Sequence, residues 1–279
     1  MTKPVLPFLE TMITQVCNLS CEGCTNYSDL THSGYVPWSQ GHTWISAWLE
    51  HVDILDFGIM GGEPMINPEW QDWVAGVRKL MPHSQIRFTT NGTLLTKHPD
   101  ILEFLRDVGN VVFKITVHTD DDAVESFIND LFQRYAWNPV VEHGINRWSM
   151  DQGIRLQINR PDTFLRTFQG TYNTMRPWHS APEQAFEICC QKTCPLLYQG
   201  NIYKCSTAGL LRDVLERHDQ PNWQEWESYL PQPLSVDSPH SDIVNFVENF
   251  GKPHSICGQC PKQSNHLGVI EHRMRVVKK

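Results

Sequence analysis

The 279-residue sequence predicts an α/β protein built on a parallel sheet. Short, almost continuously apolar segments alternate with longer segments of helical periodicity, an order typical of strand–helix units whose sheet is covered by helices. The length suits one large domain, or a barrel with an appendage. We therefore expect an open barrel of five or six strand–helix units, followed by a smaller C-terminal region.

The expected elements follow one another through the first 160 residues. Strands are expected over residues 8–16, 54–60, 85–90, 111–117 and 154–159. Helices are expected over residues 43–52, 68–80, 99–108 and 120–135. Asn67-Pro68 is a typical helix start, and Gly109 a typical helix end. The pattern weakens after Asn159, and we expect residues 160–190 to hold one further strand–helix unit.

Composition excludes several classes of function. The formal net charge of −8 argues against electrostatic binding of nucleic acid or of an anionic membrane. No apolar run approaches the length of a membrane span, and the first residues lack the apolar core of a signal peptide. In such a chain nine cysteines indicate metal ligands rather than disulfides. We expect a cytoplasmic protein with neither a nucleic-acid nor a membrane partner.

Three cysteines lie directly after the first expected strand. Cys17, Cys21 and Cys24 have the spacing C-x3-C-x2-C in Cys17-Asn18-Leu19-Ser20-Cys21-Glu22-Gly23-Cys24. Barrels place their chemistry on loops at strand ends, and thiolates suit iron–sulfur clusters, zinc or copper(I). A structural zinc site and an electron-carrying cluster each require four ligands. Three local thiolates therefore suggest a cluster with one open iron. Structural cysteines or a zinc knuckle are the alternatives.

This segment resembles the signature of the radical S-adenosylmethionine (radical SAM) superfamily, including its common Cys-Asn-Leu beginning. The resemblance implies a partial (β/α)6 TIM barrel and a [4Fe–4S] cluster on Cys17, Cys21 and Cys24. It also implies that the open iron binds the amine and carboxylate of SAM. One departure is Gly23, where relatives usually have an aromatic residue.

A second motif, Gly61-Gly62-Glu63-Pro64, follows the second expected strand. Two glycines allow a close approach of the backbone to a ligand, although an ordinary turn is the alternative. The motif resembles the superfamily's Gly-Gly-Glu-Pro, which implies that Gly61, Gly62, Glu63 and Pro64 bind the SAM amine. Weaker candidates for SAM contacts stand at later strand ends: Asn91, His118, Gln157, and, as further options, Asn159 and Arg155.

Six more cysteines lie near the C-terminal end. Cys189, Cys190, Cys194 and Cys205 surround an expected hairpin, and Cys257 and Cys260 form a C-x2-C pair. The arrangement resembles the SPASM/twitch extension of radical SAM enzymes, which implies one auxiliary [4Fe–4S] cluster in residues 186–279 after a barrel in residues 1–185. The expected ligands are Cys194, Cys205, Cys257 and Cys260. Cys190 is the alternative to Cys194, Cys189 is expected to be a small buried residue, and a zinc ribbon is the alternative to a cluster.

Together the motifs imply an enzyme that reductively cleaves SAM and abstracts a substrate hydrogen, with flavodoxin or ferredoxin as electron donor. A fully ligated auxiliary cluster favours net oxidation. We expect a ribosomally made peptide as substrate, although the 16 residues before Cys17 leave no room for an N-terminal peptide-recognition domain. The alternative is oxidation or epimerisation of a small polar molecule such as an aminocyclitol or sugar. A non-catalytic metal-binding interaction protein is a remote alternative. The Trp-, Pro- and acid-rich segment 221–239 is expected to be a surface insertion, with a cap or docking loop as the alternative.

Overall fold

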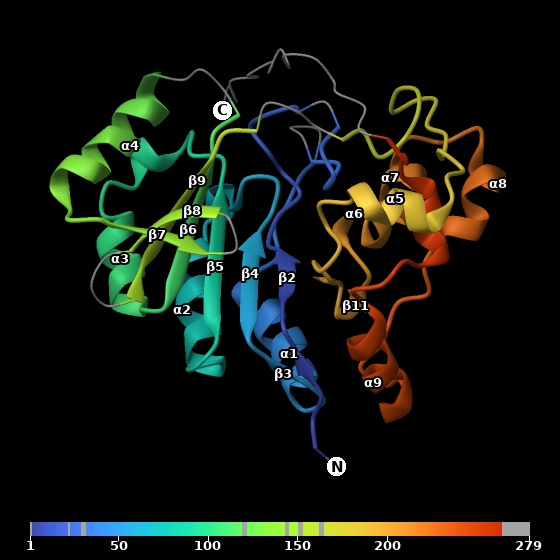
Figure 1. The fold of residues 1–279 in the computed structure, drawn as a ribbon, viewed down its shortest axis with the longest axis horizontal. Helices are drawn as coiled ribbons and strands as arrows, with labels where there is room; N and C mark the ends of the chain where they lie inside the picture. Colours follow the sequence, from blue (N-terminus) through green and yellow to red (C-terminus); the bar gives the residue numbers. More distant parts are fainter. Residues whose placement is uncertain are drawn as a thin grey trace.

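The computed structural model describes residues 2–21, 23–28, 32–118, 122–142, 145–149, 153–161 and 165–263. Within these residues a nine-stranded sheet runs through the molecule in the order β11-β10-β2-β4-β5-β6-β9-β8-β7 (Figure 1). Its strands are β2 (Leu9–Met12), β4 (Asp56–Met60), β5 (Gln85–Thr90), β6 (Val111–Thr116), β7 (Asn138–Glu142), β8 (Ile145–Ser149), β9 (Arg155–Asn159), β10 (Leu196–Tyr198) and β11 (Asn201–Tyr203). Strands β10, β2, β4, β5, β6 and β9 pair in parallel, and antiparallel pairs form both edges. The predicted α/β class with a parallel partial barrel is confirmed. A separate pair joins β1 (Val5–Leu6) to β3 (Asp53–Ile54).

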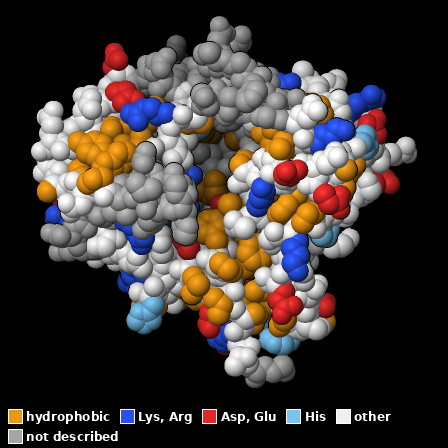
Figure 2. Space-filling model, in the orientation of Figure 1, with side chains coloured by type: hydrophobic (Ala, Val, Ile, Leu, Met, Phe, Trp, Pro, Cys, Tyr) orange, Lys and Arg blue, Asp and Glu red, His pale blue; other side chains and the backbone are white. Residues whose placement is uncertain are grey.

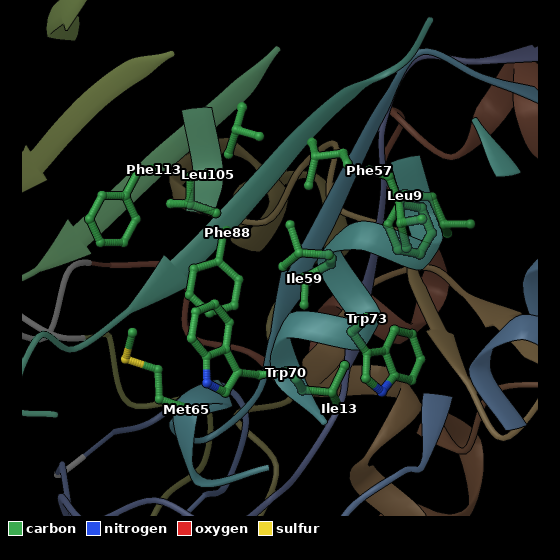
Figure 3. Close-up of a cluster of buried hydrophobic side chains, with 14 of the residues drawn as sticks. Leu9, Ile13, Phe57, Ile59, Met65, Trp70, Trp73, Phe88, Leu105 and Phe113 are labelled. Carbon is green, nitrogen blue, oxygen red and sulfur yellow. The ribbon is translucent and has the colours of Figure 1, made fainter. Parts of the chain in front are cut away.

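Helices alternate with the parallel strands and cover one face of the sheet. They are α1 (Trp38–Leu49), α2 (Trp70–Leu80), α3 (Ile101–Val108) and α4 (Asp122–Arg134), with the 3-10 turns η1 (Pro64–Ile66) and η2 (Leu95–Lys97). The main core lies between this helical layer and the sheet, where Phe57, Phe88 and Phe113 of the strands meet Trp73 and Leu105 of the helices (Figure 3). All five side chains are fully buried. None of the helices in the described part of the chain is long and apolar enough to cross a bilayer.

Some predicted boundaries were wrong. Helix α1 begins at Trp38, five residues earlier than expected. Gly41 lies on the buried face of α1 but has no apolar side chain, so the apolar pattern of the sequence does not reveal the first turn of the helix. The ring of Trp73 occupies the space of a Cβ on Gly41, 2.0 Å from the nearest ring atom, so α1 and α2 pack closely there. The β7–β8 hairpin was not predicted.

The expected further strand–helix unit in residues 160–190 is also corrected. In the described part of that range there is an isolated bridge between Gln169 and Arg176, and then α5 (Pro182–Ile188). The sixth parallel position is instead taken by β10, which belongs to the expected C-terminal hairpin. Its Leu196 and Leu197 are fully buried and pair with Glu10 and Thr11 of β2. The C-terminal region thus extends the barrel sheet.

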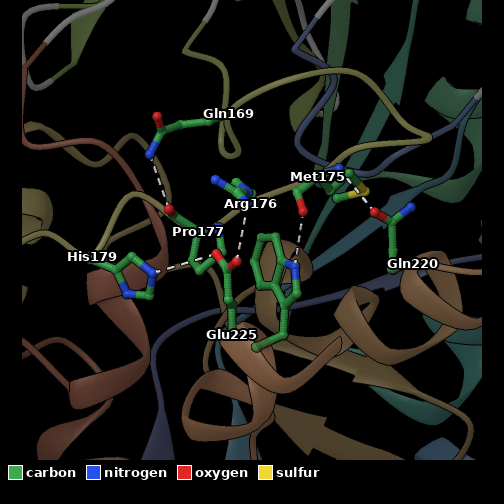
Figure 4. A network of polar contacts seen from close by, with 8 residues as sticks. Gln169, Met175, Arg176, Pro177, His179, Gln220 and Glu225 are labelled. Atoms are coloured by element: carbon green, nitrogen blue, oxygen red, sulfur yellow. Dashed lines mark hydrogen bonds and ion pairs between the residues drawn. The ribbon is translucent and has the colours of Figure 1, made fainter. Parts of the chain in front are cut away.

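The C-terminal elements are α5, α6 (Ser206–Gly209), α7 (Leu211–Arg217), α8 (Trp223–Trp226), η4 (Glu227–Tyr229), α9 (His240–Asn249) and η5 (Ser255–Gln259). Ile243 of α9 belongs to the main core, whereas α7, α8 and η4 surround a second core. Trp226 is fully buried in this core and its Nε1 donates to the carbonyl of Met175 at 3.4 Å. Beside it Gln220 accepts from the Met175 amide at 2.9 Å and Arg176 pairs with Glu225 at 3.5 Å (Figure 4). The segment 221–239, expected to be a surface insertion, is thus anchored by one buried residue, Trp226, while its other residues are half-buried or exposed.

Candidate functional site

A cavity of about 340 Å³ lies at the carboxyl ends of β4, β5 and β6. Figure 2 shows the surface hollowed between the sheet and the C-terminal helices. The cavity wall brings together segments that the sequence singled out separately. It includes Cys17, Cys21, Gly23, Cys24, Gly61, Gly62, Asn91 and His118. The same wall includes Thr89, Lys114, Thr116 and Cys190, which were not predicted to face SAM.

The cysteine loop is shaped by its own backbone. The Cys24 amide donates to the Cys21 carbonyl at 3.2 Å, and the Cys17 sulfur accepts from the Leu19 amide at 3.4 Å. Burial raises the pKa of Cys21 to about 12 and that of Cys17 further. A coordinated metal reverses this effect, because its charge stabilises the thiolate.

The glycine pair packs against this loop. An added Cβ on Gly62 would lie 2.4 Å from the Val16 carbonyl oxygen and 2.8 Å from the Cys17 Cβ. A Cβ on Gly61 would lie 2.6 Å from the Thr14 carbonyl oxygen. The Gly62 amide donates to that same Thr14 carbonyl at 2.8 Å. The close approach that needs glycine here is therefore one of backbone to backbone, and it fixes the base of the cysteine loop.

Glu63 does not line the cavity. Its fully buried carboxylate accepts from the Met65 amide at 3.1 Å, the Thr90 hydroxyl at 2.8 Å and the Asn91 amide at 2.7 Å. Burial raises the pKa of Glu63 to about 7 despite these hydrogen bonds. Pro64 begins η1, is buried, and does not line the cavity either. Glu63 thus holds the turn after β5 in place.

Asn91 completes a polar connection between the loops. Its Nδ2 donates to Asn18 Oδ1 at 2.9 Å, and Asn18 Nδ2 donates to the Thr93 hydroxyl at 2.6 Å. The sequence did not predict this role of Asn18. Gln157, expected to contact SAM, is buried outside the cavity wall and donates to Asn159 Oδ1 at 3.0 Å.

A smaller cavity of about 30 Å³ lies among the C-terminal cysteines. Its sulfur-bearing wall consists of Cys189, Cys190, Cys205, Cys257 and Cys260. Burial raises the pKa of Cys205 to about 12 and that of Cys260 well above its usual value, and neighbouring thiols add to the shift of both. Cys190 lines both cavities and therefore stands between them.

Cys194 does not line the small cavity, whereas Cys189 does. Cys189 was expected to be an inert buried residue. It ends α5 next to the cavity, and its sulfur accepts from the Gln191 amide at 3.3 Å. The structure therefore groups Cys189 and Cys190, rather than Cys194, with Cys205, Cys257 and Cys260.

The possible metal ligands at the two cavities are mainly cysteine thiols. All nine cysteines are free thiols. Among the described residues, no three His, Cys, Asp or Glu side chains converge closely enough to hold one metal ion. Tetrahedral zinc, with Zn–S near 2.3 Å, would need sulfurs about 3.8 Å apart. Thiolates are ligands of iron–sulfur clusters as well as of zinc, and cysteines line both cavities.

The fold and the main cavity thus define a class of enzyme that combines a partial parallel barrel with a cysteine-lined site at its strand ends. Residues 11–143 match the family model described as Radical SAM superfamily, and the chain carries a radical SAM domain over these residues. This family implies SAM and a [4Fe–4S] cluster.

Individual relatives differ in how much of this chain they match. A GTP 3′,8-cyclase from Campylobacter fetus subsp. fetus (strain 82-40) is 25% identical over 127 residues, 44% of this chain and 38% of that protein. The matched region is thus well under half of that relative. The crystal structure of BtrN in complex with AdoMet and 2-DOIA covers 94% of this chain and 98% of its own, with a TM-score of 0.55 at 13% identity. The two chains share a fold nearly end to end. Streptococcus suis SuiB bound to precursor peptide SuiA matches 44% of this chain and 26% of its own, with a TM-score of 0.36 and 19% identity.

Proposed function

We propose that this radical SAM enzyme holds its SAM-binding [4Fe–4S] cluster on Cys17, Cys21 and Cys24. The convergence of these cysteines with Gly61, Gly62, Asn91 and His118 on one cavity supports the proposal. When bound, the cluster and SAM supply a 5′-deoxyadenosyl radical that abstracts a hydrogen atom from the substrate. The chain's own part is to hold the cysteine loop against the glycine pair and to enclose the reactants away from bulk water.

We further propose that Cys189, Cys205, Cys257 and Cys260 hold an auxiliary [4Fe–4S] cluster in the region 186–279. This set replaces Cys194 by Cys189, because Cys189 lines the small cavity and is an electrostatic neighbour of both Cys205 and Cys260. Cys190 also lines the small cavity, but it faces the main cavity as well. Four protein thiolates leave no iron for substrate, which suits electron transfer and net oxidation. The C-terminal region joins the 1–185 barrel through β10, so the auxiliary site stays close to the main cavity. Flavodoxin or ferredoxin is the proposed donor, in the reducing cytoplasm that unpaired thiols require.

A small polar molecule is the substrate class that the main cavity suits best. Its deeper wall carries Thr89, Lys114 and Thr116, so a ligand there would meet hydroxyls and a cation. The nearly full-length fold likeness to BtrN, whose structure is a complex with AdoMet and 2-DOIA, supports this class.

A ribosomally made peptide is the second candidate. The observation in its favour is a groove of about 510 Å³ beside α9, lined also by residues 230–234 and by Ile202 of the edge strand β11. Such a groove could take an extended peptide segment. SuiB is a protein whose structure holds a precursor peptide.

The iron content of the protein and its ability to cleave SAM test the proposal. Anaerobically reconstituted protein should carry about eight irons in two clusters, and Ala at Cys17, Cys21 and Cys24 should remove about half of them and abolish 5′-deoxyadenosine formation. Unchanged iron in the triple variant would contradict the assignment. To separate the two substrate classes, deuterium transfer into 5′-deoxyadenosine should be measured with perdeuterated polyols and hydroxy acids and with deuterated peptides.

A further inference from the structure

The face of the sheet that lines the main cavity is polar, in contrast to the face that packs on the helices. Along β5 and β6, Phe88 and Phe113 point into the core, whereas Thr89, Lys114 and Thr116 line the cavity. Thr89 and Lys114 are aligned in the β5–β6 register. A packed barrel interior would carry branched apolar residues at such positions. The polar side chains of Thr89, Lys114 and Thr116 therefore indicate that the main cavity binds a polar ligand.

Lys114 is the charged group of this wall, and in the described part of the chain it has no hydrogen-bond or ion-pair partner. Among the described residues, no hydrogen bond or ion pair reaches its ammonium group. Its charged neighbours are Arg87 and Glu10, with the Cys190 and Cys194 thiols nearby. Arg87 is already paired with Asp56 and stacked on the ring of Phe8 at 5.0 Å.

Glu10 does not neutralise Lys114 near pH 7. No ion pair joins the two side chains in the described structure. Burial raises the pKa of Glu10 to about 8, so its carboxyl is largely protonated at neutral pH. Burial also lowers the pKa of Lys114, as expected for an ammonium group short of water and counter-ions. An unpaired cation inside a protein is costly, and a ligand anion would relieve that cost.

The position of Lys114 separates it from the SAM side of the cavity. It precedes His118 by four residues, about 13 Å along an extended strand. The cysteine loop and the glycine pair lie at the strand ends, so Lys114 lies deeper in the barrel. Cys190 reaches the same cavity from the end of α5.

We propose that Lys114, with the Thr89 and Thr116 hydroxyls, binds a carboxylate of the substrate. The inference rests on the proposed function and deepens it by naming an acidic small molecule as substrate class. One cation and two hydroxyls match the single charge and two oxygens of a carboxylate. The same cation disfavours a substrate that would place an ammonium group at this point.

Cys190 makes the proposal testable without knowledge of the substrate. Iodoacetate and its neutral isostere iodoacetamide alkylate the same thiolate, so the ratio of their rates at Cys190 reports the local attraction for a carboxylate and cancels the pKa of the thiol. The ratio is measured anaerobically on the cluster-loaded protein by peptide mass spectrometry. Lys114→Met should lower it about tenfold, and Lys114→Arg should keep it within about threefold of wild type. The matched control is Lys192→Met, because Lys192 is two residues from Cys190 but lies over the Phe186 ring, outside the cavity wall, and should leave the ratio unchanged.

A second measurement, on the wild-type protein, keeps the inference testable even if the variants misfold. Malonate should protect Cys190 from iodoacetamide, and neutral malonamide should not. Equal protection by both, an unchanged ratio in Lys114→Met, or no alkylation of Cys190 would each overturn the inference. A tenfold weaker SAM affinity in Lys114→Met would assign the lysine to the SAM carboxylate instead, which also overturns it. Failure of the wild type to bind iron or cleave SAM would count against the proposed function, whereas these outcomes in a SAM-cleaving protein count against the carboxylate site alone.

Discussion

At the scale of single residues, Glu63 is the buried group that holds the loops of the main cavity together. Its carboxylate accepts from the Thr90 hydroxyl and from the amides of Met65 and Asn91, and Asn91 then reaches Asn18 of the cysteine loop. Glu63 therefore acts as a positioning residue, because its oxygens are used inside the protein.

Glu63→Ala should leave three buried donors without an acceptor. We expect a loss of about 2–4 kcal/mol in the free energy of unfolding, and SAM binding about tenfold weaker through displacement of Asn91. Iron content should stay at the wild-type level. The control is Glu69→Ala, which removes a carboxylate that accepts from the Trp38 amide at 2.7 Å, away from the cavity. Wild-type SAM affinity and stability in Glu63→Ala would show that these hydrogen bonds do not position the site.

Glu10 should make stability depend on pH. Burial raises its pKa from 4.5 to about 8, so the folded protein keeps a proton that the unfolded chain loses. The stability contribution of this proton is full below about pH 4.5 and is lost progressively as the pH rises to about 8. The thermal midpoint of the wild type should therefore fall relative to Glu10→Gln between pH 5 and 8, by an amount equivalent to a few kcal/mol. Parallel midpoint curves for the two proteins would exclude the effect.

At the scale of elements, the turn after β4 and the loop after β2 form one unit. Both glycines of this turn face backbone atoms of the other loop, and the Glu63 amide donates to the Val16 carbonyl at 2.9 Å. A change in one loop must therefore move the other.

Gly62→Ala tests this coupling. The new methyl group would meet the Val16 carbonyl at 2.4 Å, so the cysteine loop must shift. We expect a cost of about 1–3 kcal/mol and loss of the first cluster, with about four irons retained at the C-terminal site. Gly251→Ala is the control, since its nearest neighbour is the Thr193 Cγ2 at 3.8 Å. Full iron content in both variants would show that the loop tolerates the shift.

At the scale of the whole molecule, the C-terminal cysteines depend on contacts distant in sequence. Strand β10 docks on β2, and the carbonyl of Gly258 accepts from the Ser180 amide at 2.9 Å. Helix α5 packs against η5, and Cys189, which follows α5, lines the small cavity together with Cys257 of η5.

Single serine substitutions should separate the two candidate ligands. Cys189→Ser should lose about four irons and the signal of the auxiliary cluster in paramagnetic resonance, because it removes one of four thiolates. Its thermal midpoint should also fall, since metal binding contributes to folding in such regions. Cys194→Ser should keep both clusters. The reverse outcome would restore Cys194 as the ligand.

The sequence by itself determined the fold class and the main chemistry, because both are encoded locally. The alternation of apolar strands with helices sets a parallel sheet, and Cys17, Cys21 and Cys24 lie close enough in the chain to share one loop. The tertiary structure alone decided the rest. Cys189, Cys190 and Cys194 fall within six residues, so spacing could not rank them, and only the docking of α5 against η5 places Cys189 at the small cavity. Likewise Lys114 is one cation in an apolar strand, and whether it meets solvent, a carboxylate or a cavity depends on the strands beside it. The burial of a side chain and the pairing of its charge depend on residues that are distant in the sequence, so only the packed structure determines them.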